Sequence, residues 1–181
     1  MSIRTLALVV LSVAACKHAA PGALIPHTTG PIKIDGEWDE PDWPKLALRG
    51  QFVGDDGKLA RPSSEVRLLH DDTTLYVGLY AADENVQSSD AFQLELGGHS
   101  WTLSVLGTIA PPTPGAQVAV DRDATLDDPR DNDEEWKIEL ALPLAVTGLR
   151  PGEPAPLRAS RCDVTKDGVK RCGAWSGAVT L

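Results

Sequence analysis

The sequence is poor in positive charge and in aromatic residues other than tryptophan. Its 181 residues include 17 Lys and Arg against 26 Asp and Glu, for a formal net charge of −9. A nucleic-acid-binding protein needs a basic face to neutralise phosphates, so this balance argues against that class of function. Tyr and Phe occur twice each, whereas Trp occurs five times, alongside 16 Gly and 14 Pro. So many Gly and Pro residues suit a fold with short turns better than one with long helices.

Catalytic motifs are also lacking. The sequence contains no Gly-x-Ser-x-Gly, no His-Glu-x-x-His and no phosphate-binding loop. His70 and His99 are the only histidines after residue 31, and neither falls in the spacing of a catalytic triad. Carboxylates are plentiful, but without an evident cleft they argue only weakly for glycoside hydrolysis. We therefore expect a protein that is not an enzyme.

The N-terminal segment resembles a secretory signal. Arg4 precedes the apolar run 6–11, which is too short to span a membrane. The ending Val13-Ala14-Ala15-Cys16 resembles the lipobox of bacterial lipoproteins, in which the cysteine is acylated, with palmitate for example, and becomes the new N-terminus. The alternative is ordinary cleavage after Ala15, which would leave Cys16 as a free thiol.

The residues around Cys16 predict a domain anchored at the cell envelope. We expect residues 1–15 to be a signal peptide and residues 16–31 to be the lipidated cysteine and a flexible tether, because 17–31 is rich in Pro and Gly and has no periodic apolar pattern. Lys17 rather than Asp follows the cysteine. In Gram-negative lipoproteins this implies sorting to the outer membrane. Residues 32–181 are then long enough for one domain, which contacts the membrane only through its lipid.

The two remaining cysteines predict a disulfide. The segment 166–168 (Lys-Asp-Gly) fits a three-residue hairpin loop with its glycine at the left-handed position. That register places Cys162 opposite Cys172, and it makes Asp163 and Arg171 a cross-strand ion pair. In a non-hydrogen-bonded pair the Cα atoms lie about 4.5 Å apart, which a disulfide accepts. Zinc is the rival, but no nearby His or third Cys completes its site. A disulfide also agrees with an oxidising compartment.

Alternating apolar and polar residues predict strands through much of the chain. The segments with this pattern are 65–70, 75–80, 91–96, 100–105 and 136–142. Strands at this spacing, each with one apolar face, predict an all-β fold, an antiparallel β-sandwich of jelly-roll or immunoglobulin-like type. The best helical candidate is the short piece after Pro143, residues 144–149, so we expect one short helix at most.

Several segments together resemble carbohydrate-binding module family 9 and its DOMON-like relatives. In order, they are 34–43 (IDGEWDEPDW), 66–69 and 71–77 (VRLL, DDTTLYV), 90–96 (DAFQLEL) and 135–143 (EWKIELALP). The resemblance covers residues 32–175. It implies a single β-sandwich that binds sugars or carries haem. Haem-carrying members use a methionine ligand, and the only methionine here is Met1, which is removed with the signal. A bis-histidine site made by His70 and His99 is the less favoured alternative for haem.

The family resemblance implies a sugar held between two tryptophan rings, but this chain departs from that pattern. Residues 86–89 (VQSS) stand where one ring belongs, and the C-terminal loop for the other is short. We expect two other tryptophans to form a ligand face with polar side chains on neighbouring strands. The candidate ligand-binding residues are Trp101, Trp175, Gln93, Thr102, Arg158 and Arg161. The alternative is that the tryptophans are core residues and the polar ones are ordinary solvated sheet residues.

The acidic stretch 121–135 is the candidate metal site. Its carboxylates offer hard oxygen ligands, and some members of the family bind calcium. Asp121, Asp123 and Asp127 are the calcium candidates. The EF-hand spacing fails, because position six from Asp121 is Leu126 rather than Gly. A solvated loop is therefore the preferred interpretation, and calcium is the one cofactor left open.

These patterns predict a noncatalytic carbohydrate-binding lipoprotein, anchored at the outer membrane, whose partner is a glycan or a sugar end. The alternative is a structural or protein-interaction component of the outer membrane, with an envelope protein as its partner and no sugar site.

Overall fold

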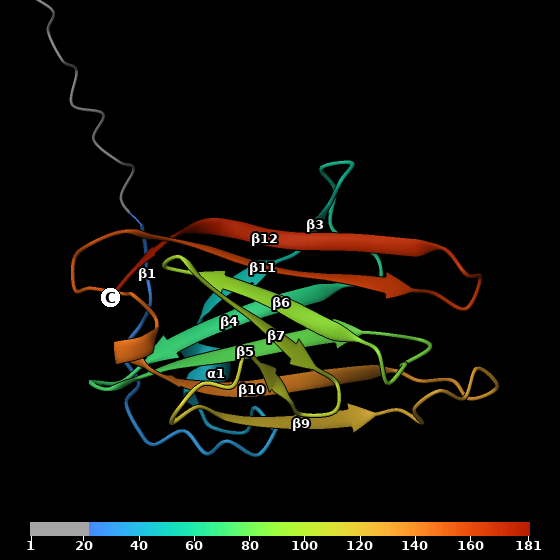
Figure 1. Cartoon of the computed structure of the whole chain (residues 1–181), viewed down its shortest axis with the longest axis horizontal. Coiled ribbons are helices and arrows are strands. Elements are labelled where there is room, and N and C mark those ends of the chain that lie inside the picture. The colour runs from blue at the N-terminus through green and yellow to red at the C-terminus, as the bar shows by residue number, and fades with distance from the viewer. Residues whose placement is uncertain (1–21) are drawn as a thin grey trace, which may run out of the picture.

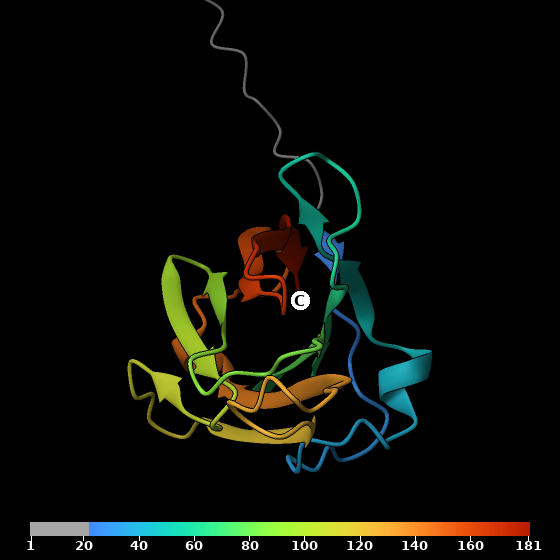
Figure 2. The same cartoon turned by 90° about the vertical axis from the view of Figure 1, so that its right-hand side faces the viewer.

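The computed structural model describes residues 22–181, which fold into two stacked β-sheets (Figures 1 and 2). In sheet A the order is β1 (Ala23–Leu24), β12 (Lys170–Thr180), β11 (Ala155–Val164), β6 (Ala91–Leu96), β7 (His99–Ser104) and β8 (Ile109–Ala110), with β3 (Val53–Gly54) also paired to β12. In sheet B the order is β2 (Leu48–Gln51), β4 (Ser64–His70), β5 (Thr74–Ala82), β10 (Glu135–Pro143) and β9 (Gln117–Asp123). The expected all-β sandwich is confirmed.

The strands form where side chains alternate between the space within the sandwich and solvent. In β6, Phe92, Leu94 and Leu96 are buried, whereas Gln93 and Glu95 are exposed. Successive side chains of a strand point to opposite faces, so this alternation gives one apolar and one polar surface. All five expected strands are present, with bounds within two residues of those expected.

The main core lies between the two sheets. Phe92 of β6 contacts Trp136 of β10 at a centroid distance of 4.8 Å, and Phe52 packs edge-on against Phe92 at 5.9 Å. All three side chains are at most 1% exposed. Because Phe92 and Trp136 come from different sheets, their contact joins the two layers of the sandwich.

A second apolar cluster covers the outer face of sheet B. The segment 29–47 crosses this face and includes the short helix α1 (Asp42–Lys45), which the sequence patterns did not predict. Trp43 is fully buried there against Leu69 and Tyr76. Glu139 of β10 fastens the segment, because its carboxylate accepts bonds from the Gly36 amide at 3.0 Å and the Trp43 indole at 2.9 Å.

The domain begins earlier than residue 32. β1 pairs in parallel with the end of β12, Ile25 is fully buried, and the Thr28 amide donates to the carbonyl of His70 at 2.7 Å. Residues 23–31 are therefore part of the sandwich rather than the expected tether, because one buried Ile and a few backbone bonds dock a stretch too short to show periodicity. The expected signal peptide, Cys16 and the first part of the tether lie outside the described residues.

The expected hairpin joins β11 to β12. Cys162 pairs with Cys172 in the predicted register, and the two form a disulfide with a Cα–Cα distance of 4.0 Å. The expected ion pair between Asp163 and Arg171 is wrong. Asp163 points inward to Arg161 at 3.0 Å, whereas Arg171 reaches along the hairpin to Asp167 at 3.3 Å.

The helical content is small and differs from expectation in place and type. The piece after Pro143 forms one 3₁₀ turn, η1 (Leu144–Val146), rather than an α-helix. In residues 22–181 no helix has the length and apolar character needed to cross a membrane.

Candidate functional site

A groove of about 520 Å³ lies on the outer face of sheet A. β6, β7, β11 and β12 all contribute to it, and its polar lining is Glu95, His99, Ser100, Arg158 and Ser176. Glu95, Ser100, Arg158 and Ser176 point outward because each strand alternates and places its apolar residues inside, whereas His99 lies on the same side of β7 as Trp101 and is exposed because it stands at the end of the strand. The groove is therefore built on four neighbouring strands rather than on mobile loops.

The turn between β6 and β7 positions His99 at the rim of this groove. Gly97 and Gly98 both have positive φ values, +56° and +88°, which suit a two-residue hairpin turn. A Cβ on Gly97 would lie 2.4 Å from the carbonyl oxygen of Thr147, so only glycine fits there. The turn delivers His99 as the first residue of β7, with its side chain exposed.

A second hollow, of about 490 Å³, shares His99 with the groove. It is completed by Trp101 and by the proline-rich segment 111–114. The His99 ring stacks on Trp101 with centroids 5.8 Å apart and an interplanar angle of 27°. Trp101 is only 3% exposed, and its indole donates to the Thr113 hydroxyl at 2.8 Å. The buried Trp101 thus packs against one face of the exposed His99 ring.

An ion pair crosses the groove between β6 and β11. Arg158 lies opposite Glu95 in the strand register, and their charged groups are 3.7 Å apart. Arg158 also donates to the Ser160 hydroxyl at 2.7 Å. The guanidinium of Arg158 offers several N–H donors and the carboxylate of Glu95 offers acceptors, and both side chains are partly exposed to solvent. Such a set can bind the neighbouring hydroxyl groups of a small polar ligand.

The six expected ligand-binding residues do not form one surface. Gln93 and Thr102 lie on the outer face and bond to each other at 2.9 Å, and Arg158 lines the groove on that face. Trp101 points to the inner side and reaches only the rim of the second hollow. Trp175 also points inward, where it packs against the core. The pairing register decides these directions, and the sequence alone does not show which face is open.

Arg161, expected to bind a ligand, is instead a buried structural residue. Its guanidinium lies 2.7 Å from Asp83 and 3.0 Å from Asp163, and the side chains of all three are at most 4% exposed. Asp83, Asp90 and Asp163 form a cluster of carboxylates within 4.8 Å of one another. Burial is the main reason that the pKa of Asp90 rises to about 6, and it also raises the pKa of Asp163. Arg161 balances part of this buried negative charge.

The calcium candidates lie apart from that cluster. Asp121 and Asp123 belong to the edge strand β9, where Asp121 pairs with Lys137 at 3.0 Å. Asp127 lies in the following loop and accepts a bond from the Ser88 amide at 2.9 Å. In the described part of the chain, no group of three metal-ligating side chains within 4.8 Å includes any of them. The carboxylates of Asp121 and Asp127 thus take part in an ion pair and a loop contact.

Sequence reasoning missed His99 and Ser176 as groove residues. His99 directly follows the Gly-Gly turn, which could have marked it as the residue exposed at the end of a hairpin. Ser176 could not have been found this way, because its place depends on its pairing with Arg158.

The structure is similar to several solved carbohydrate-binding proteins. A family 9 carbohydrate-binding module from Caldicellulosiruptor kristjanssonii, solved with cellotriose, matches with a TM-score of 0.60 at 12% identity, over 85% of this chain and 82% of that one. The same kind of module from this organism, solved with glucose, matches with a TM-score of 0.57 at 12% identity, over 83% of each chain. The fold is that of carbohydrate-binding module family 9.

A protein from Bacteroides uniformis that is proposed to bind carbohydrate also matches. Its TM-score is 0.50 at 10% identity, over 86% of this chain and 90% of that one. No protein-family model matches the sequence, and no curated protein matches it significantly. The likeness to family 9 is therefore one of fold, and the function has to be argued from the groove.

Proposed function

We propose that this protein is a noncatalytic carbohydrate-binding domain whose site is the groove on the outer face of sheet A. The observation that carries the proposal is the exposed His99 ring, backed by Trp101 and placed beside the Arg158–Glu95 pair. A pyranose has an apolar face that stacks on an aromatic ring and hydroxyl groups that bond to polar side chains. The groove offers both surfaces within one hollow. Modules of the same fold solved with glucose and cellotriose support this class of ligand.

Binding of a sugar would require little movement of the side chains that line the groove. His99 is held by its stacking on Trp101, and Arg158 is held by Glu95 and Ser160. Side chains that are already ordered lose less conformational entropy when a ligand binds. We therefore expect a sugar to bind to a preformed surface, with its ring over His99 and its hydroxyls between Arg158 and Glu95.

The proposal includes attachment to the outer membrane through an acylated Cys16. Its support is the lipobox-like ending of the apolar N-terminal segment and the disulfide between Cys162 and Cys172, which suits an oxidising compartment. Metabolic labelling with a palmitate analogue tests the anchor. The full chain should incorporate label in a Gram-negative host, and Cys16→Ser should not. Equal labelling of both chains would reject acylation at this residue.

Titration with soluble sugars tests the binding site. The purified full-length protein is titrated by calorimetry with glucose, cellotriose and a panel of other neutral oligosaccharides, and tryptophan fluorescence is followed because Trp101 lies under His99. His99→Ala and Arg158→Ala should each weaken binding about tenfold, which is about 1.4 kcal/mol. The matched controls His27→Ala and Arg150→Ala remove an exposed histidine and an exposed arginine outside the groove, and should change affinity less than twofold.

Two outcomes would overturn this site. One is neutral sugar binding that survives in the His99→Ala, Arg158→Ala double variant. The other is a flat response across the whole panel, which would favour the alternative of an interaction protein without a sugar site.

A further inference from the structure

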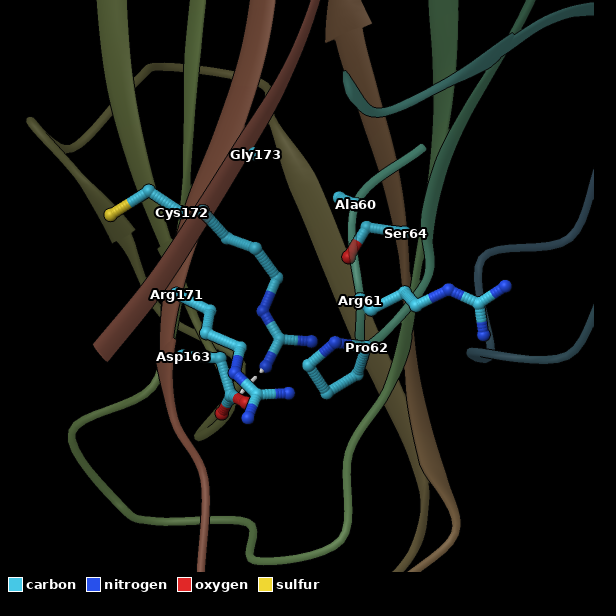
Figure 3. Close-up of a pocket in the computed structure, with 9 residues that line it drawn as sticks. Ala60, Arg61, Pro62, Ser64, Asp163, Arg171, Cys172 and Gly173 are labelled. Atoms are coloured by element: carbon cyan, nitrogen blue, oxygen red, sulfur yellow. Dashed lines mark ion pairs between the residues drawn. The ribbon is translucent and has the colours of Figure 1, made fainter. Parts of the chain in front are cut away.

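A basic hollow lies at the other end of β12 from the C-terminus. It has a volume of about 380 Å³ and is bounded by the hairpin that carries β3 and by the first residues of β12. Four cationic side chains line it, Lys58, Arg61, Lys170 and Arg171, together with the acids Asp55 and Asp56. A small adjoining cavity is lined by Arg61, Arg171 and Asp163, and the Arg61 side chain points away from the other two (Figure 3). In a chain with a net charge of −9, this surplus of positive charge stands out.

Two of the cations in the basic hollow are not neutralised by the protein. In residues 22–181, only Lys45, Arg61 and Lys170 among the Lys and Arg side chains make neither an ion pair nor a hydrogen bond, and the last two line this hollow. Asp56 is already bonded to the amide of Lys58 at 3.0 Å and lies 3.7 Å from its ammonium group. Arg61 and Lys170 therefore present uncompensated charge to whatever enters.

The basic hollow continues the surface that carries the sugar groove. The outward residues of β11 and β12 form successive pairs, which are Arg158 with Ser176, Ser160 with Ala174, Cys162 with Cys172, and Val164 with Lys170. Ser176 lines the groove and Lys170 lines the basic hollow. Six residues separate them, which is about 20 Å along a strand. Only small side chains and the disulfide lie between the groove and the basic hollow, so an extended ligand can contact both of these sites.

The disulfide fixes the basic end of this path. Cys172 lies two residues from Lys170 and lines the basic hollow itself. The covalent link to Cys162 of β11 holds the strand that carries Lys170 and Arg171 in register. A charged site is more effective when its cations are held in place before the ligand arrives.

We propose that the basic hollow binds the carboxylate, sulfate or phosphate group of an acidic saccharide whose chain lies along β11 and β12. The inference rests on the proposed sugar groove and adds the chemical class of the saccharide. Arg61 supplies a guanidinium suited to an oxyanion and Lys170 supplies a further point charge, while Arg171, which pairs with Asp167 at 3.3 Å, adds to the positive lining. Asp55 and Asp56 leave the hollow with a net charge of +2, counted over its six charged side chains.

Paired titrations test the proposal. The full-length protein is titrated with an oligogalacturonide and with a neutral oligosaccharide of equal length, at low and moderate salt. The wild type should bind the acidic chain about tenfold more tightly, because the cations of the hollow form charge-assisted hydrogen bonds with its anionic groups. Arg61→Gln combined with Lys170→Gln should abolish this advantage and leave neutral binding unchanged. Inorganic phosphate should compete with the acidic chain and not with the neutral one.

A matched control separates the hollow from net charge. Lys45→Gln combined with Arg150→Gln removes the same charge from exposed cations outside both hollows, and should retain most of the advantage. Thermal unfolding of each variant checks the fold. An equal loss in both double variants would overturn the inference, because it would show a general charge effect.

Further outcomes distinguish this inference from the proposed function. Neutral binding without any acidic advantage would overturn the inference and leave the sugar groove standing. Absence of binding to every saccharide would overturn both. Binding to vesicles that contain phosphatidylglycerol is measured in a separate experiment. If they bind through Arg61 and Lys170 while the acidic saccharide does not, the ligand is a lipid headgroup and the inference is wrong.

Discussion

The two sheets present outer faces of opposite character. On sheet B the segment 29–47 covers the outer face and buries Trp43 and Tyr76 beneath it. On sheet A the outer face carries Gln93, Glu95 and Arg158 in contact with solvent, together with the groove that we propose as the sugar site. In the described chain, sheet B is therefore buried on both faces, whereas the outer face of sheet A is open to solvent.

The sequence records this difference in its strand patterns. β5 and β10 belong to sheet B, and each has five consecutive buried residues, Glu139 among those of β10. β6 belongs to sheet A and alternates strictly between buried and exposed. A strand that is covered on both faces needs apolar residues at every position, whereas a strand with one open face does not. Strict alternation therefore marks the strands whose outer face is open to solvent.

Removal of Trp43 should produce the largest loss of stability, because it disrupts the packing that covers the outer face of sheet B. Trp43→Ala deletes a fully buried indole that packs on Leu69 and Tyr76 and bonds to Glu139. The free energy of unfolding should fall by about 3–5 kcal/mol, because a cavity forms and the Glu139 carboxylate loses a donor. Urea-induced unfolding, followed by circular dichroism, measures this loss. A fall of less than 1 kcal/mol would mean that the segment 29–47 is not needed to hold sheet B.

Removal of the disulfide should produce a smaller loss on the open sheet. Cys162→Ser with Cys172→Ser opens a short loop with a sequence separation of 10. Loop-closure entropy for this length corresponds to about 2–3 kcal/mol of the free energy of unfolding. Chemical unfolding of the variant and of the oxidised parent measures the difference. Affinity for a neutral sugar should persist, because neither cysteine lines the sugar groove; its loss would show that the hairpin holds the groove as well as the basic hollow.

The free energy of unfolding should depend on pH through a buried carboxylate on the covered face of sheet B. Burial raises the pKa of Glu139 to about 7, above its usual value of 4.5. The folded state therefore holds this proton more tightly than the unfolded state, so the free energy of unfolding should fall as pH rises from 4.5 to 7 and level off above. The expected fall is on the order of 2–3 kcal/mol. Asp90, with its pKa raised to about 6, adds to it in the same direction.

Two substitutions in the pH series, one of Glu139 on sheet B and one of Glu95 on sheet A, test which sheet carries the pH-dependent group. Glu139→Gln should keep an acceptor for Trp43 and reduce the pH dependence to the part that Asp90 and Asp163 supply. Glu95→Gln, on the exposed face of β6, should leave the profile unchanged. If Glu139→Gln showed the same slope as the parent, the titrating group would lie elsewhere.

Prediction from sequence succeeded where a pattern is local and failed where it depends on pairing. The strands around Phe92 and Trp136 and the Cys162–Cys172 bridge follow from alternation and from one hairpin loop. The ligand face does not, because Trp101 and Arg161 change from outward to inward with a shift of one residue in register. The docking of residues 23–31 was missed for a similar reason, since one buried Ile25 gives no period to detect.

The smallest effect is expected for the Gln93–Thr102 hydrogen bond on the open face. The bond is 2.9 Å long and lies at an exposed site, where water replaces a lost partner. Thr102→Val should therefore change the free energy of unfolding by less than about 0.5 kcal/mol, as surface substitutions generally do. Ala141→Thr is the matched change on sheet B, where a hydroxyl would enter the cluster beneath Trp43. Urea unfolding of both variants compares the faces directly, and equal losses would contradict the distinction between a covered and an open sheet.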